Sequence, residues 1–203
     1  MTQALLTFSV AAALLVVLPG PDTLVIVRSM LRGGRRRAVL TAVGGLTGLC
    51  VWVAAASMGL AAVLRASHDA YYALKIAGAV YLVWLGIQSV RSRRSASLPD
   101  ERPAVARTSG FGAGLLTNLL NPKVGVFFVA FLPGFVPDGM PVAATSLLLG
   151  GIYIVETAVY AAVLVALYGP VVRWMTTDRV RRRLDRLMGV VFIGFGVRLA
   201  TEH

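Results

Sequence analysis

The break at residues 118–123 reads Asn118-Leu119-Leu120-Asn121-Pro122-Lys123, and it interrupts an apolar run at about 110–132. A second break, within an apolar run at about 3–27, reads Leu18-Pro19-Gly20-Pro21-Asp22. Proline removes a backbone donor and clashes with the carbonyl four residues before it, so both runs should kink or unwind. Unpaired backbone groups cannot face lipid. The two breaks therefore predict a pair of interrupted membrane helices that line a polar site.

The composition supports the same class. Hydrophobic residues make up 57% of the 203 residues, charged residues make up 14%, and the mean hydropathy is +0.77. A soluble domain carries about 25% charged residues. This balance excludes a disordered chain, a disulfide scaffold and most soluble enzymes, and it favours an all-α integral membrane protein in a lipid bilayer. The net charge of +11 comes from loops between apolar runs, so we expect no nucleic-acid partner.

Six apolar segments are predicted, and each is close to the length that crosses a bilayer core. They lie at about 3–27, 38–64, 70–90, 110–132, 143–168 and 184–200. Sixteen of the twenty basic residues fall in the loops after the first, third and fifth segments. Basic loops stay in the cytoplasm, so these loops should be inside and both termini outside. The arginines are Arg28, Arg32, Arg35, Arg36, Arg37, Arg91, Arg93, Arg94, Arg102, Arg107, Arg173, Arg179, Arg181, Arg182, Arg183 and Arg186.

The two halves of the chain resemble each other. Pro21 and Pro122 lie 101 residues apart, and Gly86 and Gly196 lie 110 apart. Three helices per half is an odd number, so the second half must be inverted relative to the first. The sequence thus predicts one membrane domain of two inverted three-helix repeats with broken helices 1 and 4. The first repeat covers about 1–90, a cytoplasmic loop about 91–109, and the second repeat about 110–203.

Charged residues within the apolar segments mark the candidate site. Asp22 and Lys123 follow the two prolines directly, and Glu156 lies near the middle of the fifth segment. Charges at this depth are costly, so they pair with each other or line a polar pathway. Glu156 has two interpretations, as a structural partner of Lys123 or as a binder of protons or a substrate amine. The candidate substrate-binding residues are Pro19, Gly20, Pro21, Asp22, Asn118, Asn121, Pro122, Lys123 and Glu156.

Other residues carry simpler expectations. Cys50 is the single cysteine and the two histidines are isolated, so no metal site and no cofactor is expected. Gly44 with Gly48, and Gly110 with Gly114, have the spacing of close helix packing, either within one chain or between the subunits of a homodimer. Trp52 and Trp84 lie deep within segments, where packing is the expected role.

With these breaks and the run Gly78-Ala79-Val80-Tyr81-Leu82-Val83-Trp84-Leu85-Gly86, the chain resembles the LysE/RhtB family of bacterial amino-acid exporters over essentially its whole length. The stretch Phe131-Leu132-Pro133-Gly134-Phe135 belongs to the likeness, although many members have glutamine where this chain has Gly134. The resemblance implies a multi-pass carrier of the bacterial cytoplasmic (inner) membrane that expels amino acids or close derivatives, driven by the proton-motive force. It also implies a secondary transporter, such as an antiporter, rather than an enzyme.

The mechanism expected from the sequence uses the charges of the two breaks. Half-helix N-termini and Lys123 would hold a substrate carboxylate, and Asp22 or Glu156 would hold its amine. Asp22 and Glu156 are also the proton-coupling candidates, and rocking of the two repeats would expose the site to each side alternately. The alternatives are an exporter of another small solute, such as a metal cation, and a non-transporting accessory membrane subunit.

Overall fold

The computed structural model describes residues 2–91, 109–137, 139–169 and 177–201, and within these ranges the chain is helical and contains no strand. The prediction of an all-helical protein is therefore confirmed. The elements in chain order are α1 (Thr2–Val17), α2 (Pro21–Ala66), α3 (His68–Arg91), α5 (Phe111–Leu119), α6 (Pro122–Val126), the π-helical turn η1 (Phe127–Phe131), the 3-10 turn η2 (Leu132–Phe135), α7 (Val142–Ala166) and α9 (Asp178–Thr201).

Each predicted apolar segment coincides with helical structure, and both expected breaks are present. The first segment is α1 followed by the start of α2, and residues 18–20 separate them. The fourth segment is α5 followed by α6 and η1, and residues 120–121 separate α5 from α6. The chain reverses inside α2 at Gly33 and Gly34, where Gly34 has a φ of 69° that favours glycine. The arginines around this turn are helical, whereas the sequence placed them in a longer loop.

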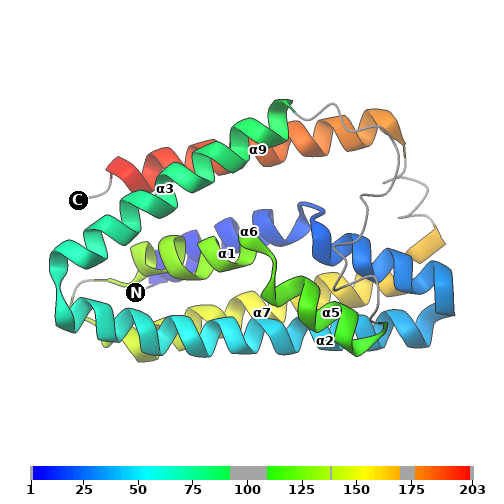
Figure 1. Ribbon diagram of the computed structural model, residues 1–203, viewed down its shortest axis with the longest axis horizontal. Helices are drawn as coiled ribbons and strands as arrows, with labels where there is room; N and C mark the ends of the chain where they lie inside the picture. The colour runs from blue at the N-terminus through cyan, green and yellow to red at the C-terminus, as the bar shows by residue number, and fades with distance from the viewer. Residues whose placement is uncertain (1, 92–108, 138, 170–176, 202–203) are drawn as a thin grey trace.

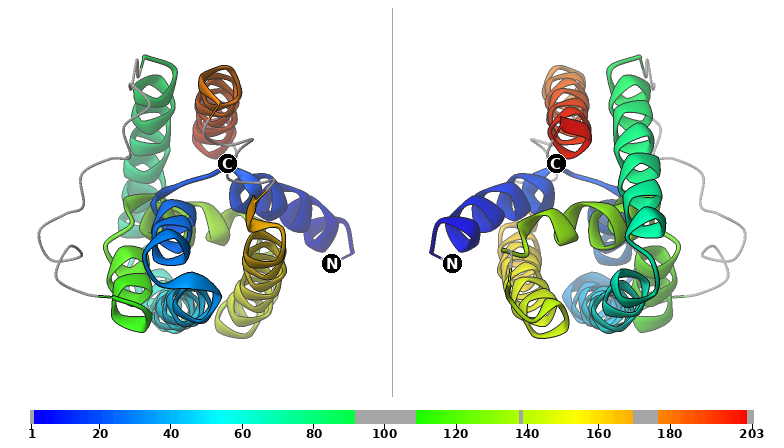
Figure 2. Two further views of the ribbon diagram at one scale, coloured as in Figure 1. Left: turned by 90° about the vertical axis from the view of Figure 1, so that its right-hand side faces the viewer. Right: turned by 90° about the vertical axis from the view of Figure 1, so that its left-hand side faces the viewer.

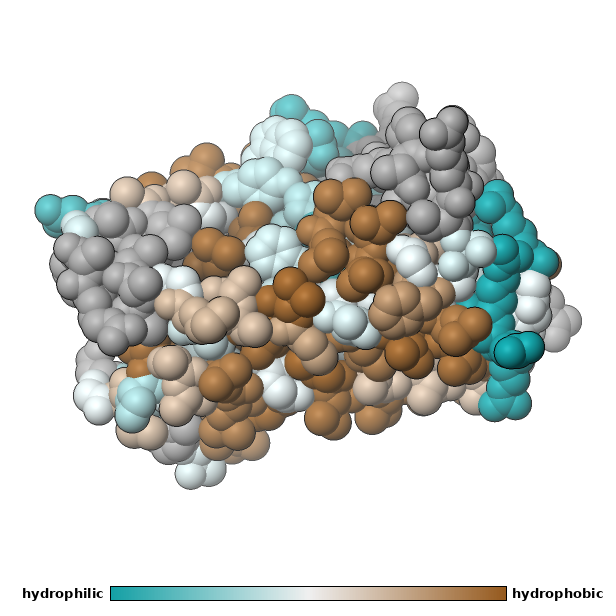
Figure 3. Space-filling model, turned by 60° about the horizontal axis from the view of Figure 1, so that its bottom comes forward, coloured by the Kyte–Doolittle hydropathy of each residue, from teal (hydrophilic) through white to brown (hydrophobic). Residues whose placement is uncertain are grey.

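The helices run back and forth along one axis (Figure 1). The start of α1 and the end of α9 lie at one end of the molecule. The turn inside α2 and the start of α9 lie at the other end, and α3 runs toward that end but stops short of it (Figure 1). The described arginines of the first and third predicted loops therefore lie toward the same end, where Figure 3 shows a hydrophilic band. Arg93, Arg94, Arg102, Arg107 and Arg173, and most of the predicted loop at 91–109, lie outside the described residues.

Seen end-on, α3 and α9 form a pair on one side, and the second part of α2, α5 and α7 form the other side (Figure 2). Glycines allow the closest approach between helices. A Cβ atom on Gly114 would lie 1.8 Å from the Thr41 carbonyl oxygen, and one on Gly44 would lie 2.0 Å from the Phe111 carbonyl oxygen. The predicted small-residue pairs thus pack α5 against α2 within one chain, and this contact holds the first half of the broken fourth segment.

Exposed hydrophobic residues recur at helical spacing on the outer surface. Leu6, Val10, Leu14 and Val17 form an exposed stripe along α1, and large hydrophobic residues cover much of the face in Figure 3. By length and composition, two described helical stretches can cross a membrane, Pro21–Gly59 and Val142–Ala166, and three shorter helices are also apolar. Exposed apolar stripes of this kind suit a lipid environment.

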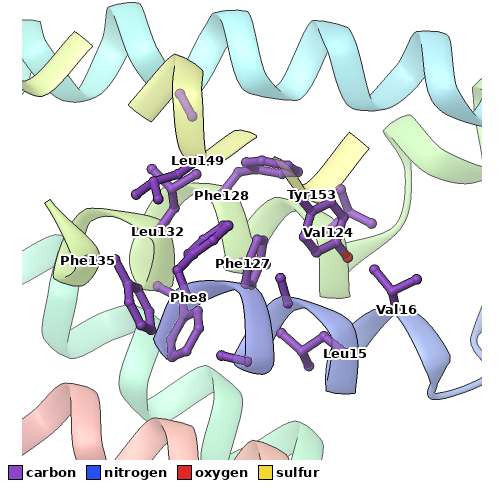
Figure 4. Close-up of a cluster of buried hydrophobic side chains, with 14 of the residues drawn as sticks. Phe8, Leu15, Val16, Val124, Phe127, Phe128, Leu132, Phe135, Leu149 and Tyr153 are labelled. Atoms are coloured by element: carbon purple, nitrogen blue, oxygen red, sulfur yellow. The ribbon is translucent and has the colours of Figure 1, made fainter. Parts of the chain in front are cut away.

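An aromatic cluster fills the core between α1, η1, η2 and α7 (Figure 4). Phe127 stacks near Tyr153 with ring centroids 4.6 Å apart, and Phe8 meets Phe135 edge-on at 5.3 Å. Aromatic pairs favour such tilted and edge-on arrangements. The Phe8 ring lies before the first break, and the rings of η1 and η2 lie after the second. Both sets therefore lie toward the end of the molecule that holds the start of α1 and the end of α9 (Figure 1).

Candidate functional site

The break in the first segment exposes backbone carbonyl groups at the end of α1. In a continuous helix the Leu15 carbonyl would accept from residue 19, but that residue is Pro19 and has no N–H. The Lys123 ammonium takes its place. Its Nζ atom donates to the Leu15 carbonyl at 2.6 Å and to the Leu18 carbonyl at 3.2 Å. A cation at the carbonyl end of a helix is electrostatically favourable, so Lys123 caps α1 from the other half of the chain.

The break in the fourth segment presents two side-chain amides. Asn121 precedes α6, and its Oδ1 atom accepts from the Lys123 backbone N–H at 3.1 Å, with Pro122 at the first helical position. Asn118 lies at the end of α5, and both asparagines are 3% exposed. Asn121 is thus an N-cap with proline at N1, and both residues are favoured at these positions of a helix start.

Asp22 is held by these two amides. Asn118 Nδ2 donates to Asp22 Oδ1 at 3.1 Å, and Asn121 Nδ2 donates to Asp22 Oδ2. Asp22 itself lies in the first turn of α2, directly after Pro21, where the helix end favours a negative charge. The carboxylate of the first break is thus bound by the second break.

The two breaks therefore exchange charges. Asp22 reaches into the second break, and Lys123 reaches into the first, so neither hydrogen-bonds the other directly. Gly20 lies beside this crossing, where a Cβ atom would be in ordinary van der Waals contact with Lys123 Cδ at 3.9 Å. The Lys123 ammonium also lies 6.0 Å from the Phe192 ring centroid of α9. Pro19, Pro21 and Pro122 contribute by removing backbone donors, which lets Lys123 bind the Leu15 carbonyl.

Glu156 occupies a separate position on α7. Its Oε2 atom is buried and has no hydrogen-bond partner among the described residues. The hydrogen bonds of Lys123 go to the Leu15 and Leu18 carbonyls, and both interpretations of Glu156 stay predictions. Tyr153 lies one turn before Glu156 on α7, and its buried ring packs against Phe127.

Comparison with known proteins identifies the family. Residues 13–203 match the family model described as LysE type translocator. This chain belongs to the LysE family. A threonine efflux protein of Escherichia coli (strain K12) is 27% identical to it over 210 residues, which cover 100% of both chains. A homoserine/homoserine lactone efflux protein of Salmonella typhimurium is 30% identical over 196 residues, which cover 97% of this chain and 95% of that protein.

A further relative is an uncharacterized membrane protein of Bacillus subtilis, 27% identical over 205 residues that cover 97% of this chain and 98% of that protein. No solved structure matches the chain. A LysE-type translocator is a membrane transport protein and not an enzyme. The predicted family, the prediction of a transport protein and the prediction that the chain is not an enzyme are therefore confirmed.

Sequence reasoning missed two contacts that this LysE-family chain makes around the site. The Trp52 indole N–H donates to the Asn118 carbonyl at 3.3 Å, although only a packing role was expected of Trp52. The Thr23 hydroxyl contacts the Tyr160 hydroxyl at 3.3 Å and links the start of α2 to α7. A signal for Trp52 was available, because it follows Gly48 by one helical turn and so faces the same neighbour.

Proposed function

We propose that this LysE-family protein is a secondary active exporter of amino acids, or close derivatives, across the bacterial cytoplasmic membrane. The observation that carries the proposal is the crossed pair of charges, in which Asp22 and Lys123 are each bound by the opposite break. Relatives whose names specify threonine and homoserine efflux support the substrate class.

A zwitterionic amino acid matches the two charges. Its carboxylate can replace the Leu15 and Leu18 carbonyls at the Lys123 ammonium, because a carboxylate accepts stronger hydrogen bonds from a cation. Its ammonium group can replace an asparagine amide at Asp22 for the same reason. Substrate binding would thus break the hydrogen bonds that join each charge to the opposite break. Because these hydrogen bonds connect the two repeats, binding would be coupled to the relative position of the repeats.

The packing supports the inverted-repeat topology with six spans. A shift of 110 residues carries Gly86 onto Gly196 and Ala79 onto Gly189. A Cβ atom on Gly86 would lie 2.7 Å from the Gly189 carbonyl oxygen, and one on Gly196 would lie 2.8 Å from the Ala79 carbonyl oxygen. The contact of Gly86 with Gly189 and the contact of Gly196 with Ala79 therefore occupy equivalent positions in the two repeats. Such equivalent contacts are expected of two repeats related by a two-fold axis in the membrane plane.

The gathering of arginines at one end supports an orientation with that end in the cytoplasm and both termini outside. The aromatic rings of α1, η1 and η2 then lie on the outer side of the two breaks. Rocking of the repeats around the crossed charges would open this side and close the other, which is alternating access. Glu156 and Asp22 are the candidates for proton coupling. The buried Oε2 atom of Glu156 has no hydrogen-bond partner within the described part of the chain, which supports its inclusion.

Efflux from proteoliposomes tests the function. Vesicles that contain the purified protein are loaded with a panel of labelled amino acids, with and without a proton gradient directed inward. We expect one class of amino acid to leave in a gradient-dependent way, and Asp22→Asn and Lys123→Ala to abolish this flux. Absence of flux for every amino acid, from protein shown to be folded, contradicts the proposal and favours another solute.

A further inference from the structure

Trp52 lies in the second part of α2, outside both breaks, yet it contacts the fourth segment on both sides of its break. Its indole N–H donates to the Asn118 carbonyl at 3.3 Å. In a continuous helix this carbonyl would accept from residue 122, which is Pro122 and has no N–H. This carbonyl accepts instead from the Asn121 backbone N–H at 3.0 Å, and Trp52 adds a second donor that ties the end of α5 to α2.

The Trp52 ring also packs beyond the break. A Cβ atom on Gly125 would lie 2.9 Å from Trp52 Cη2, so the absence of a side chain at Gly125 lets the ring lie directly on α6. One turn before Trp52, a Cβ atom on Gly48 would lie 2.8 Å from Asn118 Oδ1. One face of α2 thus contacts the end of α5, the Asn118 side chain and α6.

The position of the Asn118 amide depends on these contacts. Its Nδ2 atom donates to Asp22, whereas its Oδ1 atom is buried without a hydrogen-bond partner among the described residues. The side chain therefore has no second hydrogen bond of its own to fix its direction. Its orientation follows from where the backbone at Asn118 is held and from the shape of α2 at Gly48.

We propose that Trp52 is a positioning residue for the site: it fixes the end of α5 so that the Asn118 amide points at the Asp22 carboxylate. The consequence for substrate binding rests on the proposed function, but the positioning itself is a property of the protein alone. Tryptophan suits this role because its large ring spans the break while its single N–H reaches the carbonyl.

A spectroscopic experiment tests the positioning without any substrate. Asn118 and Asn121 are the only two asparagines in the sequence, so protein labelled selectively with ¹⁵N-asparagine gives just two side-chain amide signals. Trp52→Phe keeps most of the ring and removes the N–H. Trp84→Phe is the matched control, because Trp84 lies on α3 and is 49% exposed. We expect Trp52→Phe to move the Asn118 side-chain signal and Trp84→Phe to leave it in place. An unchanged Asn118 signal in Trp52→Phe overturns the proposal.

Flux measurements test the consequence. Loss of one neutral hydrogen bond that orients the site should raise the KM of efflux about two- to tenfold in Trp52→Phe. The double variant Trp52→Phe/Asn118→Ala should have the same KM as the single variant Asn118→Ala. A full additional increase in that background contradicts a role through Asn118. If the wild-type protein carries no amino acid at all, the proposed function fails, and the amide signals still decide the positioning role.

Discussion

Lys123→Met is the most informative single substitution, because it removes the charge and keeps an unbranched apolar stem in the same place. The lost ammonium makes two hydrogen bonds, to the Leu15 and Leu18 carbonyls. In the proposed cycle it also receives the substrate carboxylate. A charge-assisted hydrogen bond contributes about 1.5–3 kcal/mol, so losing the one to substrate should reduce efflux about ten- to 150-fold.

The same substitution should change stability much less than transport. Two acceptors at the end of α1 lose their donor, which costs about 1–3 kcal/mol for each buried group. Against this, the fold no longer has to hold an ammonium ion away from water, a penalty of several kcal/mol. The two contributions oppose each other, so we expect efflux to fall steeply while the melting temperature in detergent stays close to that of the wild type.

Initial efflux rates from proteoliposomes, corrected for the amount of reconstituted protein, measure the effect. Lys75→Met is the matched control, since Lys75 is the only other lysine in the sequence and belongs to α3. Lys123→Arg keeps the charge but replaces a compact ammonium with a planar group, so its rate should fall between those of the wild type and Lys123→Met. Full efflux by Lys123→Met would refute the assignment of Lys123 to the site.

Three further substitutions probe the site and its frame. Asp22→Asn should reduce efflux at least tenfold and move both asparagine side-chain signals, because an amide then faces two amide donors; unmoved signals would contradict the contact. Gly114→Ala should lower the free energy of unfolding by about 1–3 kcal/mol, since its Cβ atom would lie 1.8 Å from a carbonyl oxygen. Gly151→Ala is the control and should leave the free energy of unfolding unchanged, because a Cβ atom there meets open space. Thermal unfolding in detergent compares the two variants. Glu156→Gln should keep efflux down a substrate gradient and lose its acceleration by an inward proton gradient; an undiminished acceleration would leave Asp22 as the coupling group.

The sequence predicted the breaks well because proline acts locally. Pro21 and Pro122 each lack the N–H that a helix needs, wherever the rest of the chain lies, so both interruptions could be assigned from the residues alone. The close packing at Gly114 was likewise predictable from glycine spacing. Both are consequences of backbone chemistry that a single segment carries by itself.

The partners of the charges could not be predicted in the same way. Opposite charges at matched positions suggested that Asp22 and Lys123 lie near each other, but not that each binds the other break. Each charge can bind either the opposite charge or the carbonyl and amide groups of the opposite break. Which partner it binds depends on the distances between these groups in the folded chain. The contact of Trp52 with Asn118 was missed for the same reason, since it joins residues 66 positions apart on two helices.

The crossed arrangement also bears on affinity. Both charges already have partners in this conformation, so a substrate gains only the difference between its own hydrogen bonds and those it displaces. We expect a site built in this way to bind weakly and to release readily, and to avoid an uncompensated charge within the membrane when it is empty. These properties suit an exporter, which loads from a cytoplasm rich in substrate and must return empty. The resting contacts of Asp22 and Lys123 therefore support the proposed transport cycle as directly as the charges themselves do.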